Sequence, residues 1–328
     1  MEMFLQIVML VAGFVLLIKG ADWLISGASS VAQNFKVSKM LIGLTIIAFG
    51  TGAPELAVSI SSMISGNTDV LLGNVVGSNI VNVLLLLGVG AAIVPIVVKK
   101  NTVKKELPIL LLISTILVVL FLDTSLNDAT VSKISRADAI VCILLFGVFI
   151  YYLVAMAKKK KNGKNEVEKP KWKLGKSFLI TAIGLAGVVG GSQLVVNGAT
   201  SIAQAFGVSE KMISLTIVAF GTSLPELVTT ITASRRKEHD LLLGNIIGSN
   251  IFNICGVMAI PVLFGGSITA TNFDPVDLIM LIFSALLVWL FTVKDHKITR
   301  KEGWAMLAIF ALYYTYVIYV GITGVQIL

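Results

Sequence analysis

The segment at residues 42–56 reads IGLTIIAFGTGAPEL, and the segment at residues 213–227 reads ISLTIVAFGTSLPEL. A second matching pair follows, with LGNVVGSNIVN at 72–82 and LGNIIGSNIFN at 243–253. The same offset of 171 residues separates both pairs, so the residues between them align without a gap. Self-similarity at one fixed offset indicates an internal duplication. We therefore expect a fold built from two related halves.

Around these segments the chain is strongly apolar. Its 328 residues are 56% hydrophobic and only 13% charged, and its mean hydropathy is +0.93. A transmembrane helix needs about 20 predominantly apolar residues, and no long polar segment is left over for a soluble domain. The sequence therefore predicts an all-α integral membrane protein with ten transmembrane helices. The expected spans are 4–32, 40–65, 70–98, 106–122, 137–157, 175–205, 211–234, 241–265, 276–293 and 303–324.

Each half of the duplication contains five of these spans, which is an odd number. The second half must therefore enter the membrane from the opposite side, and the halves form an inverted repeat about an axis in the membrane plane. The expected organisation is a first five-helix repeat at 1–157, a basic linker at 158–174 and a second five-helix repeat at 175–328. This arrangement places the two matched motifs, 42–82 and 213–253, opposite each other near the midplane.

The basic residues predict which way the protein faces. Of the 26 Lys and Arg residues, all except Lys19, Lys133, Arg136 and Lys211 belong to alternate loops that share one side. The positive-inside rule assigns that side to the cytoplasm. The linker at 158–174 is then cytoplasmic and both termini are extracytoplasmic, in what we expect to be a multi-pass protein of the cell membrane.

Both copies of the first motif interrupt their own helix. Pro54 and Pro225 lack a backbone donor and clash with the carbonyl four residues earlier, at Gly50 and Gly221. A carbonyl freed at membrane depth needs another partner, and a cation is a suitable one. We therefore expect broken helices at the midplane, with the freed carbonyls facing a bound ion.

Two glutamates, Glu55 and Glu226, directly follow these breaks. An ionisable group at the centre of a span costs at least ~2.5–3.5 kcal/mol, so a repeated pair of them indicates a functional site. A hard cation such as Ca2+ binds roughly 6–8 oxygens, and two carboxylates neutralise one divalent or two monovalent cations. Competition between the two kinds of ion is a basis for exchange. Further oxygens are offered by Thr51, Thr222, Ser223, Ser78, Asn82, Ser249 and Asn253.

The duplicated motifs GT[SG]xPE and GNxxGSN resemble those of the cation/calcium exchanger superfamily and, within it, the prokaryotic sodium/calcium exchangers. The likeness covers the whole chain, including the ten spans and the linker after the fifth. The resemblance implies that Glu55 and Glu226 chelate Ca2+, and that Thr51 and Thr222 contribute backbone carbonyls. It also implies Na+-coordinating positions at Ala48, Ser78, Ala219, Ser223 and Ser249.

Two positions depart from the pattern of that family. Gly52 stands where the family usually has Ser, so the first repeat lacks the hydroxyl that Ser223 supplies in the second. Asn253 stands where K+-dependent exchangers carry an acid, so the chain resembles the K+-independent type. Separately, Lys19 and Asp22 lie three residues apart in the first span and form a candidate intramembrane ion pair.

These observations predict a secondary active antiporter that exchanges Ca2+ for Na+ by alternating access. The alternative is H+/Ca2+ (or other cation/H+) antiport on the same scaffold, because protons compete for Glu55 and Glu226. A cation channel is weaker, because channel pores usually arise from subunit symmetry rather than from an internal inverted repeat. No nucleophile–base pair or Cys/His metal spacing suggests an enzyme, and no prosthetic group is expected. The expected partners are Ca2+ and Na+ as substrates and the lipid bilayer, without nucleic acid or an obligate protein partner.

Overall fold

The structure is a computed structural model that describes residues 2–122, 124, 131–161, 169–206, 219–269 and 274–323. Most of the described backbone is helical, and several helices contain a π-helical turn (η), in which the hydrogen bonds span one extra residue. The elements of the first half are α1 (Glu2–Phe35), α2 (Lys39–Ile42), η1 (Gly43–Ile47), α3 (Ala48–Thr51), α4 (Ala53–Ile64), α5 (Thr68–Ile80), η2 (Val81–Leu86), α6 (Leu87–Ile93), β1 (Ile96–Val97), η3 (Thr102–Glu106), α7 (Leu107–Leu120), β2 (Lys133–Ile134) and α9 (Arg136–Lys161). The elements of the second half are α10 (Leu174–Ala205), α12 (Ala219–Thr222), α13 (Leu224–Arg235), α14 (His239–Phe252), η5 (Asn253–Met258), α15 (Ala259–Gly265), β3 (Ile268–Thr269), α16 (Pro275–Asp295), β4 (Lys297–Ile298) and α17 (Arg300–Thr323).

Seven helices in the described part of the chain are long and apolar enough to cross a membrane. An eighth span results if the bent pair 39–51 and 53–64, whose halves differ in direction by 44°, is one crossing. The fourth expected span contains α7, which has only 14 residues, and the seventh, 211–234, begins at residues that lie outside the described ones. The all-helical membrane fold and the break in the second span are confirmed, whereas the count of ten helices stays a prediction.

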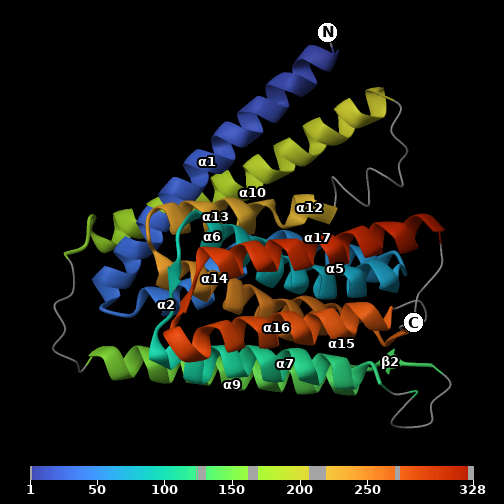
Figure 1. Cartoon of the computed structure of the whole chain (residues 1–328). Helices are drawn as coiled ribbons and strands as arrows, with labels where there is room; N and C mark the ends of the chain where they lie inside the picture. The colour runs from blue at the N-terminus through green and yellow to red at the C-terminus, as the bar shows by residue number, and fades with distance from the viewer. Residues whose placement is uncertain are drawn as a thin grey trace.

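The helices α1 and α10 lie side by side and run obliquely to the rest of the bundle (Figure 1). Glycines recur every seven residues on both helices, at Gly13, Gly20 and Gly27 and again 171 residues later. A Cβ atom added to Gly20 would come within 2.7 Å of the Val188 nitrogen, so no larger residue fits the contact. Small residues at such spacing let two membrane helices approach backbone to backbone. The glycine spacing is visible in the sequence, but the structure is needed to show that it allows close packing of α1 against α10.

Two short strand pairs tie loops together outside the helices. The strand β1 pairs antiparallel with β4, with Ile96 opposite Ile298, and β2 pairs antiparallel with β3, with Ile134 opposite Ile268. Exchanging the two halves converts one pair into the other, because β1 and β3 follow equivalent helices, α6 and α15. Paired strands must lie on the same side of a membrane. The strand pairs agree with the expected grouping of these four loops, while the side of the membrane on which each group lies stays a prediction.

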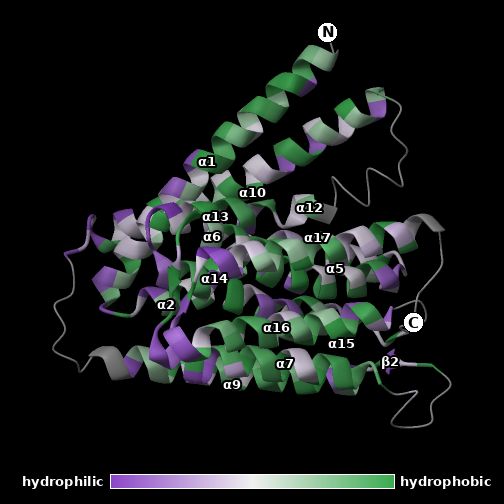
Figure 2. Ribbon diagram, in the orientation of Figure 1, coloured by the Kyte–Doolittle hydropathy of each residue, from purple (hydrophilic) through white to green (hydrophobic). Residues whose placement is uncertain are grey.

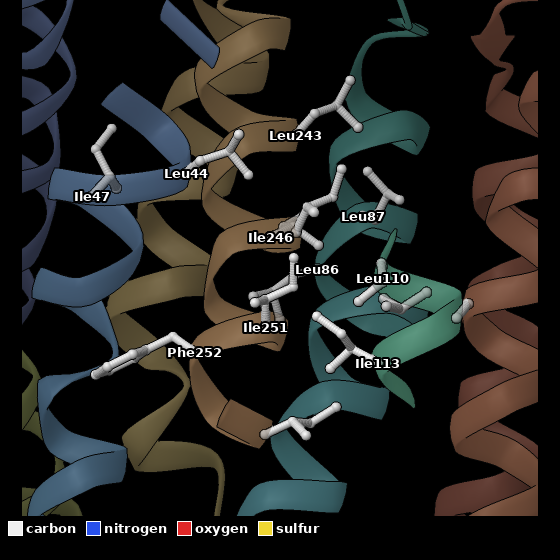
Figure 3. Close-up of a cluster of buried hydrophobic side chains, with 14 of the residues drawn as sticks. Leu44, Ile47, Leu86, Leu87, Leu110, Ile113, Leu243, Ile246, Ile251 and Phe252 are labelled. Carbon is white, nitrogen blue, oxygen red and sulfur yellow. The ribbon is translucent and has the colours of Figure 1, made fainter. Parts of the chain in front are cut away.

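The segment 243–253, which contains the second motif of the second half, lies at the centre of the bundle. In the apolar stretch of α14, η5 and α15, 89% of residues are buried inside the protein, against 17% for α1 and for α17. Leu243, Ile246 and Ile251 of α14 pack against η1, η2, α6 and α7 in a continuous apolar core (Figure 3). Hydrophobic residues also dominate the outward faces of the long helices (Figure 2), as a lipid environment requires.

Candidate cation site

The two proline motifs break their helices in the same way. Helix α3 ends at Thr51 and α4 begins at Ala53, and the residue between them, Gly52, has φ −79° and ψ 3°. Its repeat equivalent, Ser223, separates α12 from α13 with φ −85° and ψ 0°. Each proline occupies the first turn of the second half-helix, where its missing donor is tolerated. The equal backbone angles show that Gly52 is not needed for an unusual conformation.

The glutamates of both motifs lie in the first turn after each break. Glu55 is only 2% exposed and Glu226 only 1% exposed. Both sit at the positive end of a half-helix, which favours a negative charge. No ion pair reaches either carboxylate within the described residues. Within the described residues, no cationic side chain therefore compensates the negative charge that the pair carries when it is ionised.

One carbonyl freed by proline has a partner within the protein. The carbonyl of Gly221 accepts a hydrogen bond of 2.8 Å from the hydroxyl of Ser192, on α10. This carbonyl therefore does not depend on a cation for a partner, and its coordination of an ion stays a prediction. The repeat equivalent of Ser192 is Ala21, which has no hydroxyl to offer Gly50. A side-chain hydroxyl thus bonds to the freed carbonyl in the second half, whereas the equivalent residue of the first half has none.

Asparagines of the second matched element are bonded reciprocally across the two halves. The Asn82 amide nitrogen donates to Oδ1 of Asn250 at 2.9 Å, and the Asn253 amide nitrogen donates to Oδ1 of Asn79 at 3.3 Å. Each pair is converted into the other by the 171-residue offset. Because the nitrogens are engaged, the side-chain oxygens of Asn82 and Asn253 are left available. The sequence analysis missed Asn79 and Asn250, although the repeated GSN triplet contains them.

A second layer of asparagines braces the broken helices. The Asn74 amide donates to the Glu55 backbone carbonyl and to the Ser59 hydroxyl, each at 3.0 Å. The hydroxyl of Thr51 lies within donating distance of the Ile47 carbonyl (3.1 Å) and of Oδ1 of Asn245 (3.2 Å). The repeat pair Asn74 and Asn245 thus anchors both the glutamate turn and the end of α3. Sequence reasoning also missed this pair, which follows the glycine that opens each GNxxGSN motif.

Five buried oxygens of expected site residues have no hydrogen-bond partner in the described part of the protein. Such unpartnered buried groups are uncommon and call for an explanation. Helix α4 contacts η5, and α13 contacts η2, so each glutamate helix packs against the asparagine segment of the other half. All five oxygens can accept or coordinate, which suits a cation. They are Glu55 Oε2, Glu226 Oε2, Asn82 Oδ1, Asn253 Oδ1 and Ser249 Oγ.

The other expected site residues differ in how far they are buried and in whether the structure describes them. Ala48, Thr51, Ser78 and Ser223 are buried on the interrupted helices. Thr222 ends α12 and is half-buried, whereas the Ala219 side chain and residues 213–218 of the second motif lie outside the described residues.

The candidate ion pair between Lys19 and Asp22 is wrong. Oδ1 of Asp22 instead accepts from Arg236 Nη2 at 2.7 Å, which joins α1 to the residue after α13. A side chain one turn away competes poorly with a guanidinium that presents several donors in a fixed plane. The contact joins α1 to the lysine- and arginine-rich loop between α13 and α14.

The geometry defines a class of protein. A buried carboxylate pair with amide and hydroxyl oxygens, held between interrupted helices of an internally duplicated membrane protein, is typical of a secondary cation transporter. A family model described as sodium/calcium exchanger protein matches residues 5–155 and 176–319, and the chain belongs to that family.

Individual relatives agree over nearly the whole length. The chain is 36% identical over 304 residues to the uncharacterized membrane protein MJ0091 of Methanocaldococcus jannaschii, covering 92% of this chain and 94% of that protein. It is 29% identical over 344 residues to the sodium/calcium exchanger MaX1 of Methanosarcina acetivorans, covering 95% and 98%. The structure of the sodium-calcium exchanger NCX_Mj soaked with 10 mM Na+ and zero Ca2+ matches with a TM-score of 0.84 and 34% identity, covering 95% of this chain and 99% of that chain.

Proposed function

We propose that this protein is an antiporter that exchanges Ca2+ for Na+ by alternating access, with Glu55 and Glu226 as the shared carboxylates. The observation that carries the proposal is the set of five unpartnered buried oxygens. Four come from the two repeat pairs Glu55/Glu226 and Asn82/Asn253, and the fifth comes from Ser249, which the sequence also predicts. The match to NCX_Mj and to MaX1 supports the same pair of ions.

The donor set fits this chemistry. Five side-chain oxygens, supplemented by backbone carbonyls or water, approach the roughly 6–8 ligands that Ca2+ takes. The two carboxylates balance the charge of one Ca2+, while the asparagines remain neutral. Na+ ions that occupy the same carboxylates compensate that charge equally well. Because both ions need Glu55 and Glu226, they cannot both be held fully, and transport of one ion must alternate with transport of the other.

We assign the remaining roles from the resemblance and from the contacts. The Thr51 hydroxyl donates its one proton to the Ile47 carbonyl or to Asn245, and the resemblance assigns the backbone carbonyl of Thr51 as a ligand. Thr222 takes the same role in the second half. Na+ is coordinated at Ala48, Ser78, Ala219, Ser223 and Ser249.

We further propose that the chain is a multi-pass protein of the cell membrane. Its two repeats, at 1–157 and 175–328, are joined by a cytoplasmic linker at 158–174. Both termini are extracytoplasmic. Pairing of β1 with β4 supports this, because both strands adjoin loops of the lysine-rich side.

The test is Na+-gradient-driven Ca2+ uptake into proteoliposomes containing the full chain. Glu55→Gln and Glu226→Gln should each abolish uptake, because either change removes one of two charges that balance Ca2+. Glu302→Gln is the control, since Glu302 accepts from the Thr299 backbone outside the site and glutamine can still accept there. Substantial uptake by either site variant that inserts and folds would refute the assignment. Uptake that needs no counter-ion gradient would instead indicate a channel.

A further inference from the structure

A cavity of about 540 Å³ lies apart from the cation site, among the ends of four helices. Ser38 precedes α2, residues 99–106 precede α7, Tyr152 and Met156 belong to the last turns of α9, and Asp240 lies in the first turn of α14. This size falls within the range of small-ligand pockets, about 300–1,000 Å³. The cavity is lined by two lysines of the lysine-rich segment 99–105, Lys99 and Lys105.

The cavity contains a buried acid that the transport mechanism does not use. Glu106 is 1% exposed. Its Oε1 accepts from the Tyr152 hydroxyl, but Oε2 is buried and has no hydrogen-bond partner among the described residues. Leaving a buried acceptor unpaired is unfavourable, more so when it is charged. The cavity therefore lies beside a carboxylate whose second oxygen lacks a donor.

Positive charge at the cavity determines what kind of donor fits. The Lys105 ammonium lies 6.0 Å above the centre of the Tyr152 ring, and Lys99 is paired with Asp240. These lysines repel a bare metal ion, and the described residues contain no group of three or more acidic, His or Cys side chains that could hold one. An occupant that carries both an ammonium and an anionic group satisfies Glu106 and Lys105 together, because Lys99 is already paired with Asp240.

The surroundings favour an occupant that belongs to a lipid. Met40, Ala155 and Met156 give the cavity an apolar wall. On α9 the exposed residues Leu144, Val148 and Tyr151 follow one helix face, and the next position on that face is Ala155. An acyl chain along this face would bring its headgroup to the cavity.

We propose that this cavity binds the phosphoethanolamine headgroup of a membrane phospholipid, with the ammonium on Glu106 and the phosphate beside Lys105. The primary ammonium supplies the missing donor to Glu106. A phosphocholine headgroup has the same charges but no N–H group, so it cannot supply that donor. The site is independent of the carboxylate pair that binds Ca2+, although its walls include the beginnings of the helices that lead to that pair.

The test is calorimetric titration of the purified full-length protein in detergent with soluble dihexanoyl phosphatidylethanolamine. We expect binding at least tenfold tighter than that of dihexanoyl phosphatidylcholine, because a hydrogen bond to a charged group is worth a factor of ten or more. Glu106→Gln should lose at least tenfold for the ethanolamine lipid alone. Equal affinity for the two lipids would overturn the proposal.

A second pair of variants keeps the test decisive if Glu106→Gln does not fold. Lys105 lines the cavity, whereas its neighbour Lys104 does not, and both are exposed. Lys105→Gln should weaken binding of the ethanolamine lipid severalfold, and Lys104→Gln should leave it unchanged. Equal effects of the two changes would mean that only general surface charge attracts the lipid. If free phosphoethanolamine binds as tightly as the lipid, the acyl-chain contact along α9 is refuted.

Discussion

A serine at position 52 would supply the hydroxyl that the first half lacks. Comparing serine with alanine there distinguishes an effect on ion coordination from an effect on packing. In the first half Gly52 has nearly the same backbone angles as Ser223 in the second, so a serine needs no change of conformation. The obstacle to a side chain at position 52 is the lack of space around it. A Cβ atom at position 52 would lie 3.0 Å from the Ala48 carbonyl oxygen and 3.2 Å from Cδ1 of Phe252.

These distances set the magnitude of the two effects. Contacts this tight require the Phe252 ring to shift, and overpacking of this kind costs about 1–3 kcal/mol of stability. A hydroxyl that reaches a bound Na+ contributes on the order of 1.5–3 kcal/mol, the range for hydrogen bonds to charged groups. The half-saturating Na+ concentration for exchange should therefore fall by roughly tenfold or more in Gly52→Ser.

The matched control is Gly52→Ala, which adds the same Cβ atom without the hydroxyl. Both variants should unfold at lower temperature than the parent protein in detergent. Only the serine variant should need less Na+ to drive Ca2+ out of loaded proteoliposomes. If serine and alanine change the Na+ dependence equally, a hydroxyl at this position does not coordinate Na+, and the proposed asymmetry of the site is wrong.

Three further predictions concern the coupling ions and the break at Pro225. Na+-driven Ca2+ uptake should proceed fully with K+ replaced by choline, because Asn253 is uncharged; a strict K+ requirement would contradict this. A pH gradient alone, in Na+-free vesicles at clamped potential, should accumulate little Ca2+, although acid should inhibit exchange by competition; strong accumulation would identify H+ as the coupling ion. Ser192→Ala should destabilise the detergent-solubilised protein by about 1–3 kcal/mol, because it orphans the buried Gly221 carbonyl; an unchanged unfolding temperature would disprove that contact.

Much of the architecture follows from the sequence because the relevant signals are local. Apolar length predicts helices that cross a membrane, and a proline four residues after a glycine predicts the break seen at Gly52 and at Ser223. The repeat then predicts which segments are equivalent. The residues that carry the site, Glu55 and Glu226, could be found because a buried acid is conspicuous in an apolar chain.

The partners of these residues could not be predicted, because they depend on contacts between distant segments. Nothing near Asn82 in the sequence indicates that its amide bonds to Asn250, 168 residues away. Likewise Asp22 has a lysine one turn away, but the fold brings Arg236 to it instead. Spacing along one helix gives the candidates for a contact, and only the packing of helices decides among them.

The departures from internal symmetry are as informative as the symmetry itself. At three equivalent positions the second half carries the larger or more polar residue: Ser192 against Ala21, Ser223 against Gly52, and Phe252 against Val81. Ser192 bonds to the carbonyl that Pro225 frees, and Phe252 fills the space over Gly52 that a serine side chain would need. The absence of a side chain at position 52 and the presence of the ring at position 252 are therefore complementary in packing. In the proposed site, the hydroxyl that directly precedes each proline half-helix is therefore present only in the second half, while each half contributes one carboxylate and one asparagine. The charge that Ca2+ needs is thus shared equally, and the neutral oxygens that Na+ needs are not, so substitutions at position 52 should alter Na+ dependence more than Ca2+ affinity.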